Sequence, residues 1–182
     1  MRCFIAIELP EHVKSKIFHE FQTLKDKNLF GGKFVEKENL HLTLRFLGNL
    51  TKEKIEKISK KMREINFNGF RCMIGRSGFF DNEKRIRVIW IETISKSLEQ
   101  LEKKISERLP EYPPESGKFS PHITVARVEY INDRKGLIEN IKNVHLKNLN
   151  FDVDEFILMK SELTREGARH KVLERFEFNQ FP

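Results

Sequence analysis

The chain lacks long hydrophobic runs, and none of its stretches approaches the roughly 18 consecutive apolar residues that a membrane span requires. No segment is rich in Pro or Ser, and apolar residues recur along nearly the whole sequence, which argues against long disorder. The short apolar stretch at residues 4–7 is interrupted by Glu8 well before a signal peptide would be complete. These absences predict an uncleaved cytoplasmic protein that does not contact a membrane.

Cysteine is also scarce, since Cys3 and Cys72 are the only two in 182 residues. Neither has the close Cys or His spacing of a zinc site. No His-x-x-x-His helix or local carboxylate cluster suggests another metal. We therefore predict two buried free thiols and no cofactor or metal. A disulfide is the alternative if the source is a hyperthermophile.

Positive charge is in excess, because 34 Lys and Arg oppose 27 Asp and Glu and give a formal net charge of +7. This excess favours a polyanionic partner such as nucleic acid. The alternative is a Lys- and Glu-rich surface of a heat-tolerant protein, which the 34% of charged residues also fits. The length suits one compact domain or two small lobes that share a cleft.

Hydrophobic periodicity predicts a mixture of helices and antiparallel strands. Strands are expected at residues 2–9, 40–47, 67–80, 84–92, 120–128, 146–153, 155–163 and 171–178. Helices are expected from Pro10 to about residue 24 and at residues 51–65, 95–109 and 133–142. Gly31 and Gly32 are expected to break the chain, and Asp81 and Asn82 to turn a hairpin.

The most informative feature is an internal repeat. The segments HLTLRFLG at 41–48 and HITVARVE at 122–129 share the order His, apolar, Thr, apolar within a predicted strand. Each half of the chain holds one copy. Because side chains alternate along a strand, the imidazole and the hydroxyl of each copy point out of the same face.

Two such pairs suit metal-free cleavage of a phosphodiester, if the two halves pack with pseudo-twofold symmetry around one cleft. A neutral imidazole can take a proton from the attacking oxygen while an imidazolium gives one to the leaving oxygen. The Thr hydroxyls would hold the non-bridging oxygens. A lone His on a strand is more often an ordinary residue, and we expect this for the other four, His12, His19, His145 and His170.

Four segments together resemble the 2'-5' RNA ligase, or RNA 2',3'-cyclic phosphodiesterase, branch of the 2H phosphoesterase superfamily. They are RCFIAIELP, NLHLTLRFLG, SPHITVAR and LMKSELTREGARHKVLERFEF. The resemblance spans the whole chain, residues 1–182. It implies an α+β fold, bilobal and pseudo-twofold, with two antiparallel sheets flanked by helices around a central cleft. Each of the two lobes would contribute one His-x-Thr motif.

The resemblance also implies roles for individual residues. His41 would be the general acid, or proton donor, and His122 the general base, with Thr43 and Thr124 binding the phosphate. Arg127 would correspond to the basic residue that follows the second motif and contacts the phosphate. Strict alternation puts Arg127 on the face opposite His122, so this role requires a bulge, a strand end or a long reach.

Other candidates come from periodicity and composition alone. Alternation puts Arg45 beside His41, although the family does not require a basic residue there. Phe34, Phe80 or Tyr112 could stack on a base, but core packing is the more common role of a Phe. Basic residues that could follow an RNA backbone, or simply form a solvated face, are Arg71, Arg76, Lys84, Arg85 and Arg87.

The implied activity is hydrolysis of a terminal 2',3'-cyclic phosphate on RNA to a 2'-phosphomonoester, with 2'-5' ligation as an additional activity. The expected partner is RNA with such an end, tRNA fragments included, and the expected state is a monomer. Two alternatives stay open. One is a non-catalytic RNA-binding module, and the other is a 2H phosphoesterase that acts on a small cyclic nucleotide ester.

Overall fold

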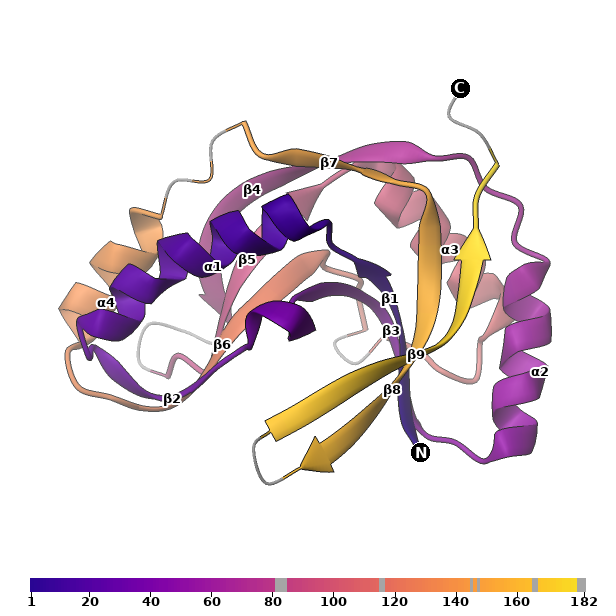
Figure 1. Cartoon of the computed structure of the whole chain (residues 1–182), viewed down its shortest axis with the longest axis horizontal. Coiled ribbons are helices and arrows are strands. Elements are labelled where there is room, and N and C mark those ends of the chain that lie inside the picture. Colours follow the sequence, from indigo (N-terminus) through magenta and orange to yellow (C-terminus); the bar gives the residue numbers. More distant parts are fainter. Residues whose placement is uncertain (81–84, 115–116, 145, 147, 165–166, 180–182) are drawn as a thin grey trace.

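The computed structural model describes residues 1–80, 85–114, 117–144, 146, 148–164 and 167–179. The described strands are β1 (Arg2–Glu8), β2 (Phe30–Phe34), β3 (His41–Asn49), β4 (Phe70–Phe80), β5 (Val88–Ile94), β6 (His122–Ile131), β7 (Asn150–Val153), β8 (Glu155–Thr164) and β9 (Gly167–Glu177). The described helices are α1 (Glu11–Asp26), α2 (Lys52–Arg63), α3 (Lys96–Arg108) and α4 (Arg134–Lys142), with a short 3-10 helix η1 (Lys37–Asn39). Figure 1 shows their arrangement.

The strands form one sheet in the order β7-β4-β5-β6-β3-β1-β8-β9, and β2 pairs with β6 beside this path. The two halves of the sheet meet at the seam between β3 and β6, where Leu42 pairs with Ile123. From the seam outward, each half begins with its His-x-Thr strand, β3 or β6. The next strand in the sheet, β1 or β5, comes earlier in the sequence and is connected to the motif strand by a segment that contains a helix, α1 or α3. This confirms the bilobal α+β fold, and the two expected antiparallel sheets are joined edge to edge at the seam.

Local sequence explains where the helices begin and which face they bury. Thr51 caps α2 by accepting a hydrogen bond from the Lys54 backbone N–H, and Asp133 caps α4 by accepting one from Gly136. The inner face of α3 is fully buried, with Leu98, Leu101 and Ile105 at helical spacing. In Figure 1, α1 and α4 lie at one end of the molecule, and α2 and α3 lie at the other.

Strand β2 was not predicted from the sequence, nor was the short helix η1. Gly31 and Gly32 were expected to break the chain, but they lie in β2 and pair with β6. Gly32 has φ +151°, and a Cβ there would lie 2.1 Å from the Arg127 carbonyl oxygen. Gly32 therefore allows a close approach of backbones at a register shift, and Gly31 leaves room for the Tyr130 ring, so the pair does not break the chain.

The structure also bears on the expected free thiols, the absence of a membrane span and the turn at Asp81 and Asn82. Cys3 and Cys72 are both buried and free, as predicted. Within the described part of the chain, no helix is long and apolar enough to cross a membrane. The expected turn at Asp81 and Asn82, together with Lys84, lies outside the described residues.

Candidate active site

The first motif histidine is anchored through one ring nitrogen. His41 Nδ1 lies 2.7 Å from the backbone oxygen of Asn39, and His41 Nε2 lies 3.0 Å from Thr43 Oγ1. A carbonyl oxygen can only accept, so Nδ1 carries the hydrogen in this bond. Nε2 is therefore the nitrogen that can accept or deliver a proton on the Thr43 side of the ring.

The second motif histidine has the same arrangement. His122 Nδ1 lies 2.7 Å from the backbone oxygen of Ser120, again two residues earlier. This carbonyl also fixes the hydrogen on Nδ1 and leaves Nε2 for proton transfer. The two motifs therefore share more than their residue types. Both histidines have the same tautomer, and in both Nδ1 donates to the backbone oxygen two residues earlier.

The sheet brings the two motifs together at the seam. Leu42 and Ile123 form the ladder pair between β3 and β6, and both side chains are fully buried. Side chains alternate along a strand, so the His and Thr on either side of each buried residue project from the other face. His122 is also among the charges that influence the ionisation of His41. Four predicted residues, His41, Thr43, His122 and Thr124, therefore share one face at the seam.

Burial disfavours the charged form of both rings. It lowers the pKa of His41 to about 4, against a partial opposing effect of the hydrogen bond to the Asn39 carbonyl. His170, Lys14 and His122 lower it further through their positive charges. Burial also lowers the pKa of His122, and the charge of Arg127 adds to this effect. An anion bound between the rings would raise both pKa values, because an opposite charge favours imidazolium.

Bulges after both motifs decide which neighbours share this face. On β3, Thr43 pairs with Ala6 but Arg45 pairs with Ile5, so one extra residue is inserted. On β6 the same shift occurs between Thr124 and Ala126, opposite Trp90 and Ile89. Each bulge reverses the alternation beyond it.

The bulge on β6 supplies what the Arg127 role requires. Arg127 lies beyond it, is exposed, and is near enough to lower the pKa of His122 by its charge. Within the described residues, no hydrogen bond or ion pair holds its guanidinium. The face that strict alternation assigned to Arg127 is therefore wrong, and its place on the same face as His122 and Thr124 agrees with the resemblance.

The bulge on β3 has the opposite consequence for Arg45. Its side chain is 2% exposed, donates to the Tyr112 carbonyl oxygen and to Ser106 Oγ at 2.5 Å each, and forms an ion pair with Glu102 of α3. Arg45 thus lies on the helix-covered face, and the expectation that it stands beside His41 to bind phosphate is wrong. Strict alternation cannot anticipate a bulge.

Of the aromatic residues predicted to stack on a base, Phe34 lies away from the site and Phe80 lies at it. Phe34 pairs with the fully buried Ala126, and its ring lies 5.1 Å from that of Phe30, toward α1. Phe34 therefore packs on the core side of the sheet, which contradicts a stacking role beside the motifs. Phe80 does reach the site, because its ring is 4.8 Å from that of His122 in an edge-to-face contact.

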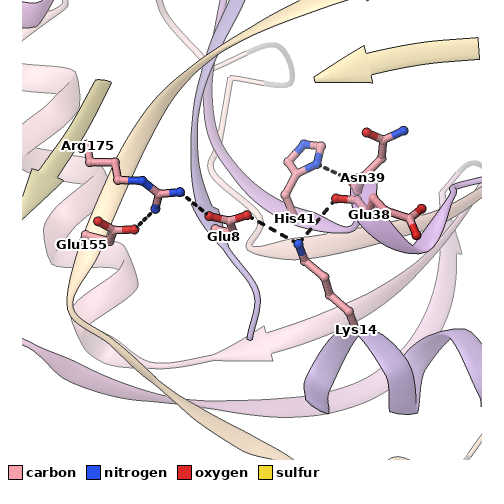
Figure 2. A network of polar contacts seen from close by, with 7 residues as sticks. All are labelled: Glu8, Lys14, Glu38, Asn39, His41, Glu155 and Arg175. Atoms are coloured by element: carbon pink, nitrogen blue, oxygen red, sulfur yellow. Dashed lines mark hydrogen bonds and ion pairs between the residues drawn. The ribbon is translucent and has the colours of Figure 1, made fainter. Parts of the chain in front are cut away.

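Each histidine has a glutamate opposite it on the neighbouring strand. Glu8 pairs with His41, and Glu92 pairs with His122. Figure 2 shows Glu8 between two cations, with Arg175 at 3.0 Å and Lys14 at 3.6 Å. Lys14 is only 8% exposed and also donates to the Glu38 carbonyl oxygen at 3.4 Å. Glu38 directly precedes Asn39, whose carbonyl oxygen accepts from His41 Nδ1.

His170 and Phe4 also contact the site, and neither was predicted to do so. The ring of His170 lies 5.0 Å from that of His41, although the sequence indicated an ordinary histidine beside a turn. The ring of Phe4 lies 4.9 Å from that of His41. No sequence signal marks either contact, because it depends on β1 and β9 lying in the same half of the sheet.

The basic residues of the β4–β5 region are in part paired. Arg71 binds Asp152 at 2.7 Å, and Arg76 lies 3.8 Å from Glu92. Tyr112 packs against the core rather than over the motifs. Among the described residues, no group of three His, Cys, Asp or Glu side chains could hold a metal ion.

The paired motifs at one seam, each with a histidine whose Nε2 is left for proton transfer, are typical of a phosphoesterase. Comparison with known proteins identifies the family. Residues 7–90 and residues 91–170 each match the LigT like phosphoesterase family, one His-x-Thr strand in each segment. The chain belongs to this family.

Its relatives cover nearly the same length. Proteins named RNA 2',3'-cyclic phosphodiesterase from Methanocaldococcus jannaschii and Thermotoga maritima are each 33% identical, over 97% and 98% of this chain and 100% and 96% of their own. The crystal structure of TT0787 of Thermus thermophilus has a TM-score of 0.83 at 27% identity, covering 97% of both chains. That of E. coli LigT complexed with 3'-AMP has a TM-score of 0.77 at 28% identity, covering 98% of both.

Proposed function

We propose that this protein is an RNA 2',3'-cyclic phosphodiesterase that opens a terminal cyclic phosphate to a 2'-phosphomonoester. The observation that carries the proposal is the pair of imidazoles at one seam, each with Nδ1 held by the carbonyl two residues earlier. The names of the curated relatives support the RNA substrate. The structures of E. coli LigT complexed with phosphate and with 3'-AMP support a site that binds the phosphate group of a nucleotide.

In the proposed mechanism the two Nε2 atoms act on opposite sides of one phosphorus. His122, neutral, takes a proton from water as the water oxygen attacks phosphorus in line with the 3'-oxygen. The bond from phosphorus to the 3'-oxygen breaks, and His41 Nε2 delivers its proton to that oxygen. The products are a 2'-phosphate and a free 3'-hydroxyl, and the two rings then exchange protons with solvent.

The low pKa of His41 fits an acid that is charged only when substrate is present. The cyclic phosphate carries a negative charge, which favours the imidazolium beside it. Thr43 and Thr124 can donate their hydroxyl hydrogens to the non-bridging oxygens. Arg127, exposed on the His122 side, can hold the same oxygens through a charge-assisted fork.

The same geometry allows phosphoryl transfer to a nucleophile other than water. A 5'-hydroxyl of a second RNA in place of water would yield a 2'-5' linkage, with His122 and His41 in unchanged roles. Ligation is therefore an additional activity to assay with two RNA ends. Cytoplasmic location and a monomeric state remain predictions from the sequence.

The test is turnover of an oligonucleotide with a 2',3'-cyclic phosphate end, in EDTA, with product identification. We expect a 2'-phosphate from the wild type and a loss of at least about a hundredfold in turnover for His41→Ala and His122→Ala. His12→Ala, on the exposed side of α1, serves as the control and should retain wild-type turnover.

Other outcomes would favour the alternatives. Binding of the oligonucleotide without product would indicate a non-catalytic RNA-binding module. Turnover of small cyclic nucleotide esters but not of the oligonucleotide would indicate a different substrate. Wild-type turnover in both single variants would contradict the acid and base roles.

A further inference from the structure

His170 is a titratable side chain next to the site that the proposed mechanism does not use. It lies on β9, opposite Ser161 of β8, and is half-buried. Its Nδ1 atom is buried and has no hydrogen-bond partner within the described residues. A buried polar atom without a hydrogen-bond partner is uncommon in a folded protein. A role for the His170 ring at this position would explain why the unpaired atom is tolerated.

The ring of His170 belongs to a cluster of three. It meets His41 at 5.0 Å between centroids and an interplanar angle of 80°, and Phe4 at 5.0 Å and 72°. Phe4 meets His41 at 4.9 Å and 33°. Edge-to-face contacts at these distances are the favoured geometry of aromatic pairs. His41 is thus confined on two sides by rings from β1 and β9.

The same part of β9 also holds the anchor of His41. Asn39 Nδ2 donates to the Ala168 carbonyl at 2.8 Å, while the backbone oxygen of Asn39 accepts from His41 Nδ1. Figure 2 shows Asn39 beside the His41 ring. Residues 168 and 170 of β9 therefore contact the anchor and the ring of the same catalytic histidine.

On the basis of the proposed function, we propose that His170 is a positioning residue for His41. Its ring, with that of Phe4, holds the plane of the His41 imidazole, and a proton on His170 opposes a proton on His41. Two imidazolium ions at this separation repel each other, and partial burial limits their screening by water. His41 therefore receives its proton while His170 is neutral.

Other charged side chains lie near the His41–His170 pair, and a test variant must leave them unchanged. Lys14 of α1 and His122 of β6 act on His41, and Glu8 of β1 is its cross-strand neighbour. On the His170 face, Ser161 of β8 lies between His170 and Arg2 of β1. The Lys160–Glu162 ion pair of β8, and Arg169 and Lys171 of β9, alternate to the other face of these strands. Among the charges acting on His41, His170 has a larger effect on its pKa than Lys14 or His122.

The test uses two substitutions in the full chain. His170→Phe keeps a ring of similar size but removes the charge, and His170→Ala removes both. The first measurement is the NMR titration of the His41 ring, which does not depend on turnover. The second is the pH profile of kcat/KM for an oligonucleotide with a 2',3'-cyclic phosphate end, together with kcat.

We expect His41 in His170→Phe to titrate at higher pH than in the wild type, and the limb of the profile that belongs to His41 to move with it. His170→Ala should lower kcat by about tenfold or more, because the plane of His41 is no longer held. If the Ala variant does not fold, the Phe variant alone decides.

An unchanged His41 titration in His170→Phe would overturn the proposal, as would wild-type kcat in a folded His170→Ala. A wild type without turnover would contradict the proposed function instead, while the His41 titration would still test the coupling.

Discussion

The neutral state of the half-buried His41 should make the protein sensitive to acid. The pKa of this ring is about 4 in the folded protein, mainly through burial, against about 6.5 in an unfolded chain. Between these values the unfolded chain binds a proton that the folded protein does not. The stability contribution of His41 is therefore fully present above pH about 6.5 and is lost as the pH falls toward 4.

The magnitude follows from the displacement of the pKa. Each unit corresponds to about 1.4 kcal/mol, so lowering the pH from about 7 to about 4.5 should cost about 2 kcal/mol through His41 alone. Carboxylates and other histidines add their own pH dependence, so the wild type must be compared with a variant. In His41→Gln the ionisable ring is absent, and this part of the acid sensitivity disappears.

Urea unfolding at the two pH values measures the effect. The wild type should lose about 2 kcal/mol more than His41→Gln between pH about 7 and about 4.5. His12→Gln is the matched control, because His12 is exposed on α1, and it should lose as much as the wild type. Equal losses in the wild type and His41→Gln would refute the lowered pKa of His41.

Three further outcomes are expected from substitutions at or near the site. Arg127→Ala should lower kcat/KM about 10- to 100-fold by removing charge-assisted bonds to the phosphate, and should move the His122 limb of the pH profile upward; an unchanged limb would contradict its proximity. Thr43→Val should lower kcat by about 3- to 10-fold, the size of one lost hydrogen bond, and unchanged kinetics would argue against its role. Arg45→Met should lower the melting temperature by about 10 °C, because Glu102 is left buried and unpaired at a cost of about 3–5 kcal/mol. Calorimetry should show recovery in Arg45→Met/Glu102→Leu with kcat near wild type, whereas a selective loss of kcat would restore Arg45 to the site.

The motif strands and all four described helices could be predicted from periodicity, because each has one buried face with a regular repeat. The sequence repeat, with His41 and Thr43 in one half and His122 and Thr124 in the other, predicted that the two halves pair. Sequence spacing of this kind reports local direction of side chains, and both motifs lie before the first irregularity of their strands.

The remaining errors share a physical origin. A bulge has no signature in an apolar run such as the one around Leu44 or Val125, so periodicity placed Arg45 and Arg127 on the wrong faces. The contact of His170 with His41 joins residues far apart in the chain, and it requires knowledge of which strands are neighbours. Such contacts follow from topology rather than from local pattern.

The central claim is that the His41 and His122 rings act together on one phosphorus. A crystal structure with uridine vanadate, which mimics five-coordinate phosphorus, tests it most directly. We expect vanadium at the seam between β3 and β6, with Nε2 of each ring within about 3 Å of an apical oxygen. Vanadate bound at only one ring, or away from the seam, would contradict the account.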